Sequence, residues 1–459
     1  MSYHPSDTLV LFILKILDAT RSIGAKKSTP LFRCTLKMTN PKLYAFTSAA
    51  CNYLPKIRLL VQSLKHYHPE IRLVLGLSDR LTFPELLSGE SWDEIMPIDT
   101  LNIPDWQRWA FTHNIVELST AIKPFVLQHL LERPDCRGVF YFDPDTVLFS
   151  RLDDLMDRLE HSDILLTPHQ NKPETELAAV MDNEICSLKH GVYNLGFIGV
   201  RPSETGKAFA HWWADRVYHF CRDDIPNGLF TDQRWIDLAP ALFKGVVVLR
   251  SSRFNVAPWN LTTRTVTGNI ATGIQVDGEP LGFYHFTGFD SGAHKIMTEK
   301  YCSKNPAIKE LVRWYETNTS GWQDDPLSNR PWAFGQFDDG TPINRAHRLI
   351  YQSRADLQKR YANPFAAVKD NDQTFSGWCK KQGCREYPDL LPIPAKNADW
   401  SSVTGRLTPS LAPPPSILQP MSTRLKKAAT NPKQALLLWR QVARAIRHEG
   451  LRGLIRRIR

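Results

Sequence analysis

The 459-residue sequence lacks a long apolar run near its start. Residues 8–17 form the longest run there, but a membrane-spanning helix needs about 20 apolar residues, and Lys15 interrupts this one. No basic segment precedes the run, and no small-residue cleavage site clearly follows it, which argues against a signal peptide. We therefore expect a cytoplasmic protein in which residues 1–38 are an extension before the first strand.

Cysteine is sparse as well. The eight cysteines are widely spaced and do not form the dense pattern of a small secreted disulfide scaffold, so we expect reduced thiols. Cys379 and Cys384 lie close together, but a structural zinc site needs about two further ligands, and the adjacent sequence offers none.

Excess charge is missing from most of the chain. The sequence contains 57 Lys/Arg and 47 Asp/Glu, and residues 421–459 hold 11 of the basic residues with one acidic residue, Glu449, which leaves 46 of each sign elsewhere. A neutral body without a recognised binding module argues against nucleic acid as a partner. In the tail, apolar and arginine residues alternate at helical spacing, which favours an anionic membrane surface at the inner face of the membrane. A helix that packs on the rest of the chain, or on a partner, would have the same pattern.

From residue 43 onward, apolar runs alternate with helical patterns. Residues 43–47 read as a strand, 54–68 as a helix and 71–77 as a second strand, which is a β-α-β unit. The strands are continuously apolar, which suits a sheet covered by helices on both faces, so we predict an α/β fold with a doubly wound, mainly parallel sheet. Further strands are predicted at 139–142, 163–167, 196–200, 245–249 and 282–286, and further helices at 123–132, 205–220 and 232–242.

This pattern predicts the organisation of the whole chain. The α/β domain is expected over residues 39–300, followed by a mostly helical extension over 301–385. Repeated prolines then predict a semi-extended linker over 386–420, and the basic amphipathic tail occupies 421–459.

Two carboxylates, Asp143 and Asp145, follow one of the predicted buried strands with Pro144 between them. Carboxylates placed this way can converge on one hard cation such as Mg²⁺ or Mn²⁺, with substrate phosphates completing the coordination. The same three residues could simply form a turn that ends the strand. The pattern also resembles the haloacid dehalogenase phosphatases, in which the first aspartate, here Asp143, would be the nucleophile.

Several segments in chain order resemble glycosyltransferase family 8 and its relatives of the GT-A fold. These are Ala45-Phe-Thr-Ser-Ala-Ala-Cys-Asn52-Tyr53, Tyr141-Phe-Asp143-Pro-Asp145, Tyr193-Asn194-Leu-Gly196, Thr231-Asp232-Gln233 and His285-Phe-Thr-Gly288. Each segment is short, but together they span residues 43–290 in the order that the family has them. The resemblance implies a GT-A domain that transfers a sugar from a nucleoside-diphosphate sugar, with uridine as the expected base, to a glycan or lipid-linked acceptor.

The resemblance also implies roles for individual residues. The metal, Mn²⁺ or Mg²⁺, would be held by Asp143, Asp145 and His285. The donor nucleotide would be bound by Thr47, Asn52 and Tyr53, with Asp79, Lys123 and Gly288 as further candidates. The sugar and acceptor cleft would be lined by the catalytic candidates Asn194, Asp232 and Gln233, and the reaction would retain the anomeric configuration.

The sequence departs from the family at the phosphate-binding positions. Lys123 stands where the family commonly has arginine, and Ser291 lies near the position of an expected lysine, for which Lys295 is a candidate substitute. A lysine and an arginine bind phosphate with different geometry, so the sequence alone does not identify the residue that binds the diphosphate. Structural roles also remain open for His285 as a buried hydrogen-bonded residue and for Asp232 as a helix cap. A fold that binds sugar or nucleotide without turnover is the non-enzymatic alternative.

Overall fold

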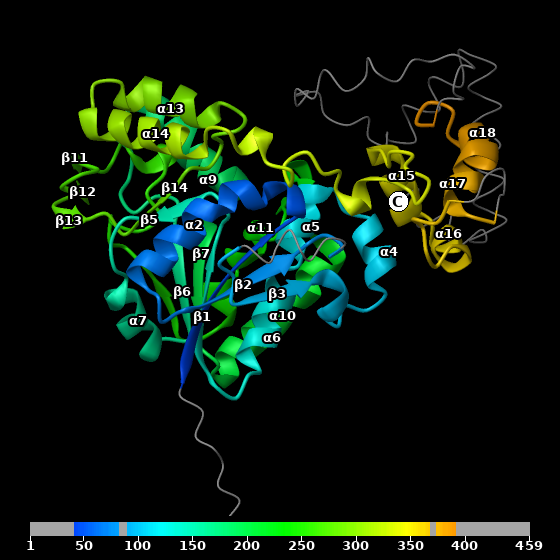
Figure 1. Ribbon diagram of the computed structural model, residues 1–459, viewed down its shortest axis with the longest axis horizontal. Helices are drawn as coiled ribbons and strands as arrows, with labels where there is room; N and C mark the ends of the chain where they lie inside the picture. The colour runs from blue at the N-terminus through cyan, green and yellow to red at the C-terminus, as the bar shows by residue number, and fades with distance from the viewer. Residues whose placement is uncertain (1–40, 82–89, 368–372, 392–459) are drawn as a thin grey trace, which may run out of the picture. The chain divides into compact units, whose positions relative to one another are not determined.

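The computed structural model describes residues 41–81, 90–367 and 373–391 (Figure 1). The predicted N-terminal extension, residues 392–420 of the predicted linker and the basic tail lie outside the described residues. Within the described residues, no helix is both long enough and apolar enough to cross a membrane.

A seven-stranded sheet forms the centre of the fold, in the order β10-β6-β7-β4-β1-β2-β3. Neighbouring strands run parallel except at β7, which is antiparallel to both β4 and β6. The predicted α/β fold with a mainly parallel sheet is therefore confirmed, with one reversed strand. The strands are β1 (Lys42–Ala49), β2 (Arg72–Leu77), β3 (Glu94–Pro97), β4 (Cys136–Phe142), β6 (Ile164–Pro168), β7 (Tyr193–Val200) and β10 (Val246–Val248).

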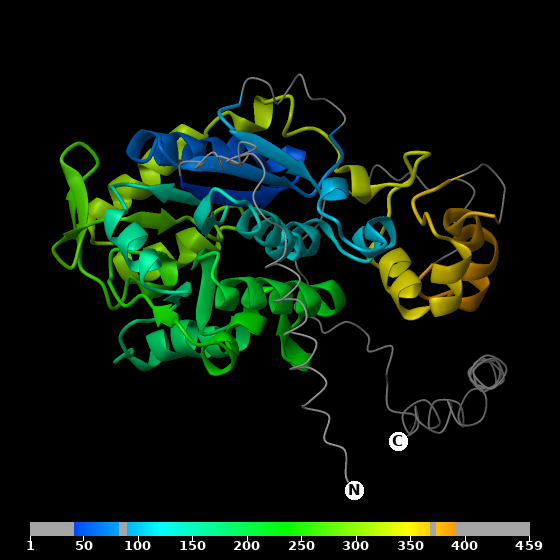
Figure 2. The same cartoon turned by 90° about the horizontal axis from the view of Figure 1, so that it is seen from below.

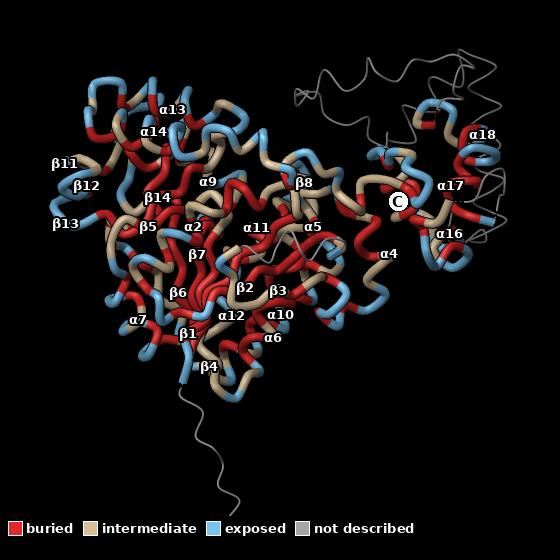
Figure 3. Tube along the Cα trace, viewed as in Figure 1, coloured by how far each residue is buried: buried red, intermediate tan, exposed pale blue. Residues whose placement is uncertain are grey.

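Helices cover both faces of this sheet, as the apolar strands predict. Along β1, Tyr44 and Phe46 face a core that includes α6 (Lys123–Leu131) and α10 (Glu204–Phe220), whereas Leu43 and Ala45 face a core that includes α2 (Leu54–Tyr67) and α7 (Asp153–Glu160). Figure 2 shows α2 on one side of the sheet and α6 and α10 on the other. The central strands are buried along most of their length (Figure 3). Burial on both faces explains why these strands lack the alternation of a half-exposed sheet.

Local sequence signals set several helix boundaries. The Ser203 side chain accepts a hydrogen bond from the Gly206 amide at 3.1 Å and so caps the start of α10. The single helix predicted over 232–242 is instead two short helices, α11 (Gln233–Ile236) and α12 (Ala239–Leu242). Pro240 lies in the first turn of α12 and has no amide hydrogen with which to continue α11. The remaining helices of the α/β part are α4 (Trp106–Phe111), α5 (Ile115–Ala121), α8 (Leu177–Ala179) and α9 (Ile185–His190).

Smaller sheets lie outside the central one. β5 (Thr146–Leu148) leaves the carboxyl end of β4 and pairs antiparallel with β14 (Phe283–His285), so that His285 lies opposite Thr146. This pairing brings a residue from late in the chain to the turn between β4 and β5, which carries the two aspartates. The other strands are β11 (Val266–Asn269), β12 (Gly273–Val276) and β13 (Glu279–Pro280) in a three-stranded sheet, and the short pair β8 (Asp223–Asp224) and β9 (Leu229–Phe230).

The residues beyond 300 are mostly helical and join the cores of the α/β part. α13 (Ala293–Cys302) and α14 (Pro306–Thr319) contribute Cys302, Ile308 and Leu311 to a core shared with β11, β12 and β14. Phe365 and Phe375 pack against Phe111 of α4, with ring centroids 5.1 Å and 5.4 Å apart. The other helices of this segment are α15 (Arg345–Ser353), α16 (Ala355–Arg360), α17 (Phe375–Trp378) and α18 (Cys384–Glu386).

Candidate metal and nucleotide site

Asp143, Asp145 and His285 converge at the carboxyl end of β4. His285 Nε2 lies 2.9 Å from Asp145 Oδ1 and 3.5 Å from Asp143 Oδ2. One ligand atom from each residue lies within 4.8 Å of the others. Two carboxylates and an imidazole form a donor set that suits a divalent cation such as Mn²⁺, so the residues fit the metal that the sequence predicted.

Backbone hydrogen bonds hold the two aspartates in a tight turn. The Asp143 amide donates to the Gly196 carbonyl of β7 at 3.0 Å, and the Thr146 amide donates to the Asp143 carbonyl at 3.0 Å. The Phe286 amide, next to His285, donates to the Asp145 carbonyl at 2.8 Å. The turn expected from Asp-Pro-Asp is therefore present, and it is the same feature that aims both carboxylates at His285.

Lys123 links Asp143 to Asp232. Its Nζ lies 3.2 Å from a carboxylate oxygen of each. Burial alone would lower the pKa of Lys123, but the two carboxylates raise it well above its usual value, so the side chain is an ammonium. Tyr141 donates from Oη to Asp143 Oδ1 at 2.5 Å, the same oxygen that Lys123 contacts, so both groups orient this carboxylate.

The hydrogen bonds of Asn194 determine the tautomer of His285. The Gly196 amide donates to Asn194 at 2.8 Å, so the atom that it faces must be the side-chain oxygen. His285 Nδ1 lies 3.2 Å from the same oxygen and must therefore carry the proton that it donates. Nε2 is the ring nitrogen that faces the two carboxylates, and a bound metal would take the place of its proton, which is the arrangement required of a metal-ligating histidine.

The two neighbouring aspartates also determine the pKa of His285. Burial alone lowers the pKa of its imidazole, but the charge and hydrogen bond of Asp145, with a further contribution from Asp143, raise it above the usual value. The same imidazole lowers the pKa of Asp145 against the effect of burial. The site therefore favours positive charge between the two aspartates.

Gly196 leaves the space that this arrangement needs. A Cβ atom at residue 196 would lie 2.4 Å from His285 Nδ1 and 2.6 Å from Asn194 Oδ1, and both distances are too short for any side chain. This close approach gives a physical reason for glycine in the Tyr193-Asn194-Leu-Gly196 segment.

Asn194 and Gln233 form one hydrogen-bonded unit. Gln233 Oε1 accepts from the Leu195 amide at 3.0 Å and from Asn194 Nδ2 at 3.3 Å, while Gln233 Nε2 donates to the His190 carbonyl at 3.0 Å. Both ends of the glutamine amide are thus engaged by protein atoms. Gln233 holds β7 against the end of α9 and orients Asn194.

Asp232 is almost completely buried, with 2% of its surface exposed. Burial raises the pKa of its carboxyl group, whereas Lys123 lowers it. The preceding residue, Thr231, has a φ of 45°, a left-handed conformation that is rare for a β-branched residue. Thr231 directly precedes Asp232, whose carboxylate pairs with Lys123.

Thr47 lies near the carboxyl end of β1, beside β2, and Asn52 lies in the segment that follows β1. Within the part of the chain that the structure describes, Thr47 Oγ1 and Asn52 Oδ1 are buried polar atoms without a hydrogen-bond partner. An unsatisfied buried polar group costs roughly 1–3 kcal/mol, so two of them in neighbouring segments favour a polar ligand. The Tyr53 hydroxyl donates to Asp290 Oδ2 at 3.4 Å.

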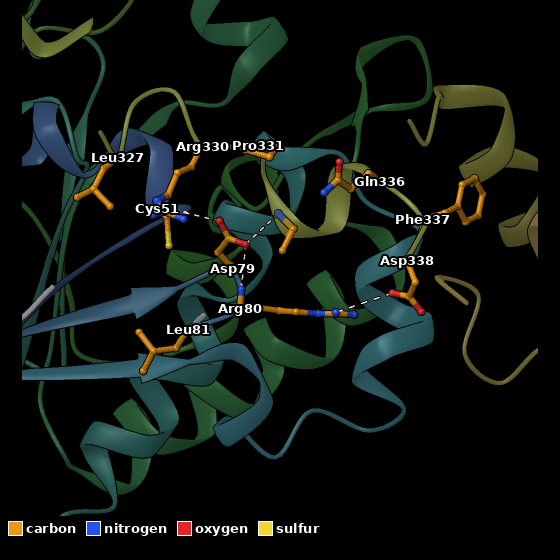
Figure 4. A pocket seen from close by; sticks show the side chains of 11 residues that line it. Cys51, Asp79, Arg80, Leu81, Leu327, Arg330, Pro331, Gln336, Phe337 and Asp338 are labelled. Atoms are coloured by element: carbon orange, nitrogen blue, oxygen red, sulfur yellow. Dashed lines mark hydrogen bonds and ion pairs between the residues drawn. The ribbon is translucent and has the colours of Figure 1, made fainter. Parts of the chain in front are cut away.

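The Asp79 carboxylate is occupied by backbone amides. Oδ1 accepts from Arg80 at 2.9 Å and from Ala333 at 3.0 Å, and Oδ2 accepts from Cys51 at 3.2 Å. Burial raises the pKa of this carboxyl group, and the three amides offset part of that effect. Figure 4 shows Asp79 between the segment after β1 and the chain near residue 333. Asp79 thus fastens the residues after α14 to the candidate nucleotide site.

A cavity of about 400 Å³ lies next to Asp79 (Figure 4). One wall comes from the ends of β1 and β2, and the other from the segment that follows α14. Its lining residues are Cys51, Asp79, Arg80, Leu81, Leu327, Arg330, Pro331, Ala333, Gln336, Phe337 and Asp338. The mixture of ionic, amide and aromatic groups suits a polar ring system.

Two further candidate positions lie in and after the loop that follows His285. Gly288 has a φ of 70°, and its carbonyl accepts from Ser291 Oγ and from the His294 amide, each at 3.1 Å. Gly288 therefore shapes the loop. Lys295 is 73% exposed on α13 and lies 3.8 Å from Glu299, so its charge is directed to solvent.

Three residues of the site were not among the sequence candidates. Tyr141 lies two residues before Asp143, and the period of two along a strand could have placed both on one side. Asn255 Nδ2 donates to Asn194 Oδ1 at 2.9 Å, and His169 Nε2 accepts from Asn194 Nδ2 at 3.1 Å. No local pattern in the sequence marks Asn255 or His169, because their importance arises from contacts between distant segments.

No family model matches the chain. The chain is 26% identical over 307 residues to the uncharacterized protein YfnD of Bacillus subtilis (strain 168), covering 64% of this chain and 93% of that one. It is 25% identical over 252 residues to the uncharacterized protein YfnF of the same organism, covering 53% and 82%. Among solved structures it resembles the galactosyltransferase LgtC in complex with donor and acceptor sugar analogues, at 15% identity and a TM-score of 0.35, covering 60% of this chain and 95% of that one.

Proposed function

We propose that this chain is a metal-dependent glycosyltransferase of the GT-A type, similar to glycosyltransferase family 8, that transfers a sugar from a uridine-diphosphate sugar to a glycan or lipid-linked acceptor. The observation that carries the proposal is the convergence of Asp143, Asp145 and His285 at the carboxyl end of β4. Ligands of open α/β sheets bind at this edge. The unsatisfied oxygens of Thr47 and Asn52, on and after the adjacent strand β1, support a bound nucleotide.

Asp143, Asp145 and His285 would hold Mn²⁺ or Mg²⁺, which when bound supplies positive charge to stabilise the leaving diphosphate. Lys123 and Tyr141 hold the Asp143 carboxylate in a fixed direction. Asn194 keeps the proton of His285 on Nδ1, away from the metal side. These residues pre-organise the site before the donor arrives.

The sugar and the acceptor are proposed to lie on the side of β7 and α11. In the described structure, Asn194 and Gln233 bond to each other and Asp232 bonds to Lys123. We therefore assign these three residues to positioning the site. Asp232, the one carboxylate among these three residues, is ion-paired with Lys123, and we propose that the reaction retains the anomeric configuration.

The test is calorimetric binding of uridine diphosphate with and without Mn²⁺. We expect binding that requires the metal, and we expect the double substitution Asp143→Asn/Asp145→Asn to abolish it, because the amides remove both negative ligands. Thermal unfolding of the same variant controls for loss of the fold.

Three outcomes would overturn this proposal. If uridine, guanosine and thymidine diphosphates all fail to bind in the presence of metal, the transferase proposal is wrong. Metal-dependent release of phosphate from simple phosphomonoesters, lost on Asp143→Asn, would instead establish a phosphatase with Asp143 as nucleophile. Tight donor binding without transfer or hydrolysis across several acceptors would indicate a binding scaffold.

A further inference from the structure

Lys56 is a buried lysine in the first turn of α2, directly after the segment proposed to hold the nucleoside. Only 7% of its side chain is exposed. Lysine is almost never buried without a partner, because an isolated ammonium loses its hydration. The surroundings of Lys56 must therefore supply negative charge.

The partner of Lys56 is Asp290, in the loop after β14. Lys56 Nζ forms an ion pair with Asp290 Oδ2, and the Asp290 side chain is 51% exposed. The ammonium also lies 3.9 Å from the ring centroid of Trp322 and 4.9 Å from that of Tyr53, which places it in cation–π contact with both. The two rings hold the lysine in place, whereas an exposed carboxylate gains little from the ion pair and can be exchanged for another anion.

The loop that carries Asp290 begins at the candidate metal site. The Phe286 amide, at the start of the loop, donates to the Asp145 carbonyl at 2.8 Å. Tyr53 donates to Asp290 Oδ2 at 3.4 Å. Burial raises the pKa of the Tyr53 phenol well above its usual value, and the nearby carboxylates of Asp145 and Asp290 raise it further. Lys56, Tyr53 and the candidate metal ligands therefore border one region.

The other two candidate lysines, Lys123 and Lys295, are less suited to bind the diphosphate. Lys123 is paired with Asp143 and Asp232, each at 3.2 Å. Lys295 is largely exposed and lies near Glu299. Lys56 combines a fixed position with an exchangeable partner.

We propose that Lys56 binds the diphosphate of the nucleotide-sugar donor, and that its ammonium exchanges the Asp290 carboxylate for a phosphate oxygen when the donor binds. This inference rests on the proposed function. A lysine ammonium is a compact charge with three rotatable donors, which suits a phosphate group whose orientation is set mainly by the metal. It would supply the cation that the sequence lacks at Ser291.

The test compares Lys56→Met and Asp290→Asn in the full chain, with uridine diphosphate and Mn²⁺ followed by calorimetry and uridine followed by NMR titration. Losing a charge-assisted hydrogen bond weakens binding about tenfold to a hundredfold, so Lys56→Met should lower the affinity for uridine diphosphate by that factor. Its affinity for uridine should stay unchanged. Asp290→Asn should raise the affinity for uridine diphosphate several-fold, because it removes the competing carboxylate. Lys295→Met is the matched control and should bind as the wild type does.

The opposite directions of the two substitutions separate a binding role from a structural one. If both weaken binding by the same factor, the ion pair only supports the fold and the inference is wrong. If the wild type binds uridine diphosphate with metal and Lys56→Met binds it equally well, the inference is wrong while the proposed function stands. If the wild type binds no nucleoside diphosphate, the proposed function fails and the inference falls with it. Should Lys56→Met not fold, Asp290→Asn decides by itself, since the Asp290 side chain is half exposed.

Discussion

Replacing Asn194 by leucine should weaken metal binding without touching a metal ligand. Asn194 Oδ1 accepts three hydrogen bonds, from Gly196 N, Asn255 Nδ2 and His285 Nδ1. Leucine has a similar size but no acceptor, so His285 loses the partner that keeps its proton on Nδ1. Substitution of such an outer partner typically lowers metal affinity about 10- to 100-fold, which corresponds to about 1.4–2.7 kcal/mol.

The affinity would be measured by titrating Mn²⁺ and following the free ion by electron paramagnetic resonance. Asn194→Asp is the conservative comparison, because it keeps an acceptor oxygen for His285 and should retain the wild-type affinity or exceed it. Asn183→Leu is the matched control for stability. Asn183 is also a buried asparagine, and its Nδ2 donates to Glu174 Oε1 at 2.7 Å and to Thr262 Oγ1 at 3.2 Å, neither of which is a candidate metal ligand.

Both leucine variants should lower the free energy of unfolding, since each leaves buried polar groups without partners at roughly 1–3 kcal/mol apiece. Only Asn194→Leu should lower the Mn²⁺ affinity. If the two variants bind Mn²⁺ as tightly as the wild type, then Asn194 does not orient His285 and the tautomer argument is refuted.

Two further predictions concern stability. Asp79→Asn should lower the free energy of unfolding by roughly 1–3 kcal/mol, because the two carboxylate oxygens accept three backbone hydrogen bonds and the NH₂ group that replaces one oxygen cannot accept any. An unchanged urea midpoint would contradict this prediction. Burial lowers the pKa of His113 from 6.5 to about 4, so the unfolded chain binds more protons between these values, and stability that is complete above pH 6.5 should fall as the pH drops towards 4. His113→Gln should flatten the dependence of melting temperature on pH in this window, and an unaltered dependence would count against burial as its cause.

Much of the fold could be predicted because its signals are local. The strands at 43–47, 71–77 and 139–142 and the helices at 54–68 and 205–220 lie within a few residues of the observed β1, β2, β4, α2 and α10. Their apolar content and period depend on neighbouring residues alone. The direction of β7 could not be predicted in this way, because a strand has the same apolar pattern whether it pairs parallel or antiparallel.

The sequence by itself determined that Asp143 and Asp145 lie together at the end of a buried strand, because two residues separated by one turn residue cannot move far apart. It also pointed to His285 as a candidate third ligand, through the order of its motifs. Only the tertiary structure decided the partners of these residues. The pairing of β5 with β14 sets the position of His285, Asn194 and Asn255 meet from different segments, and Lys56 meets Asp290 across the loop after β14. Such contacts depend on how distant segments pack, and no local period or spacing encodes them.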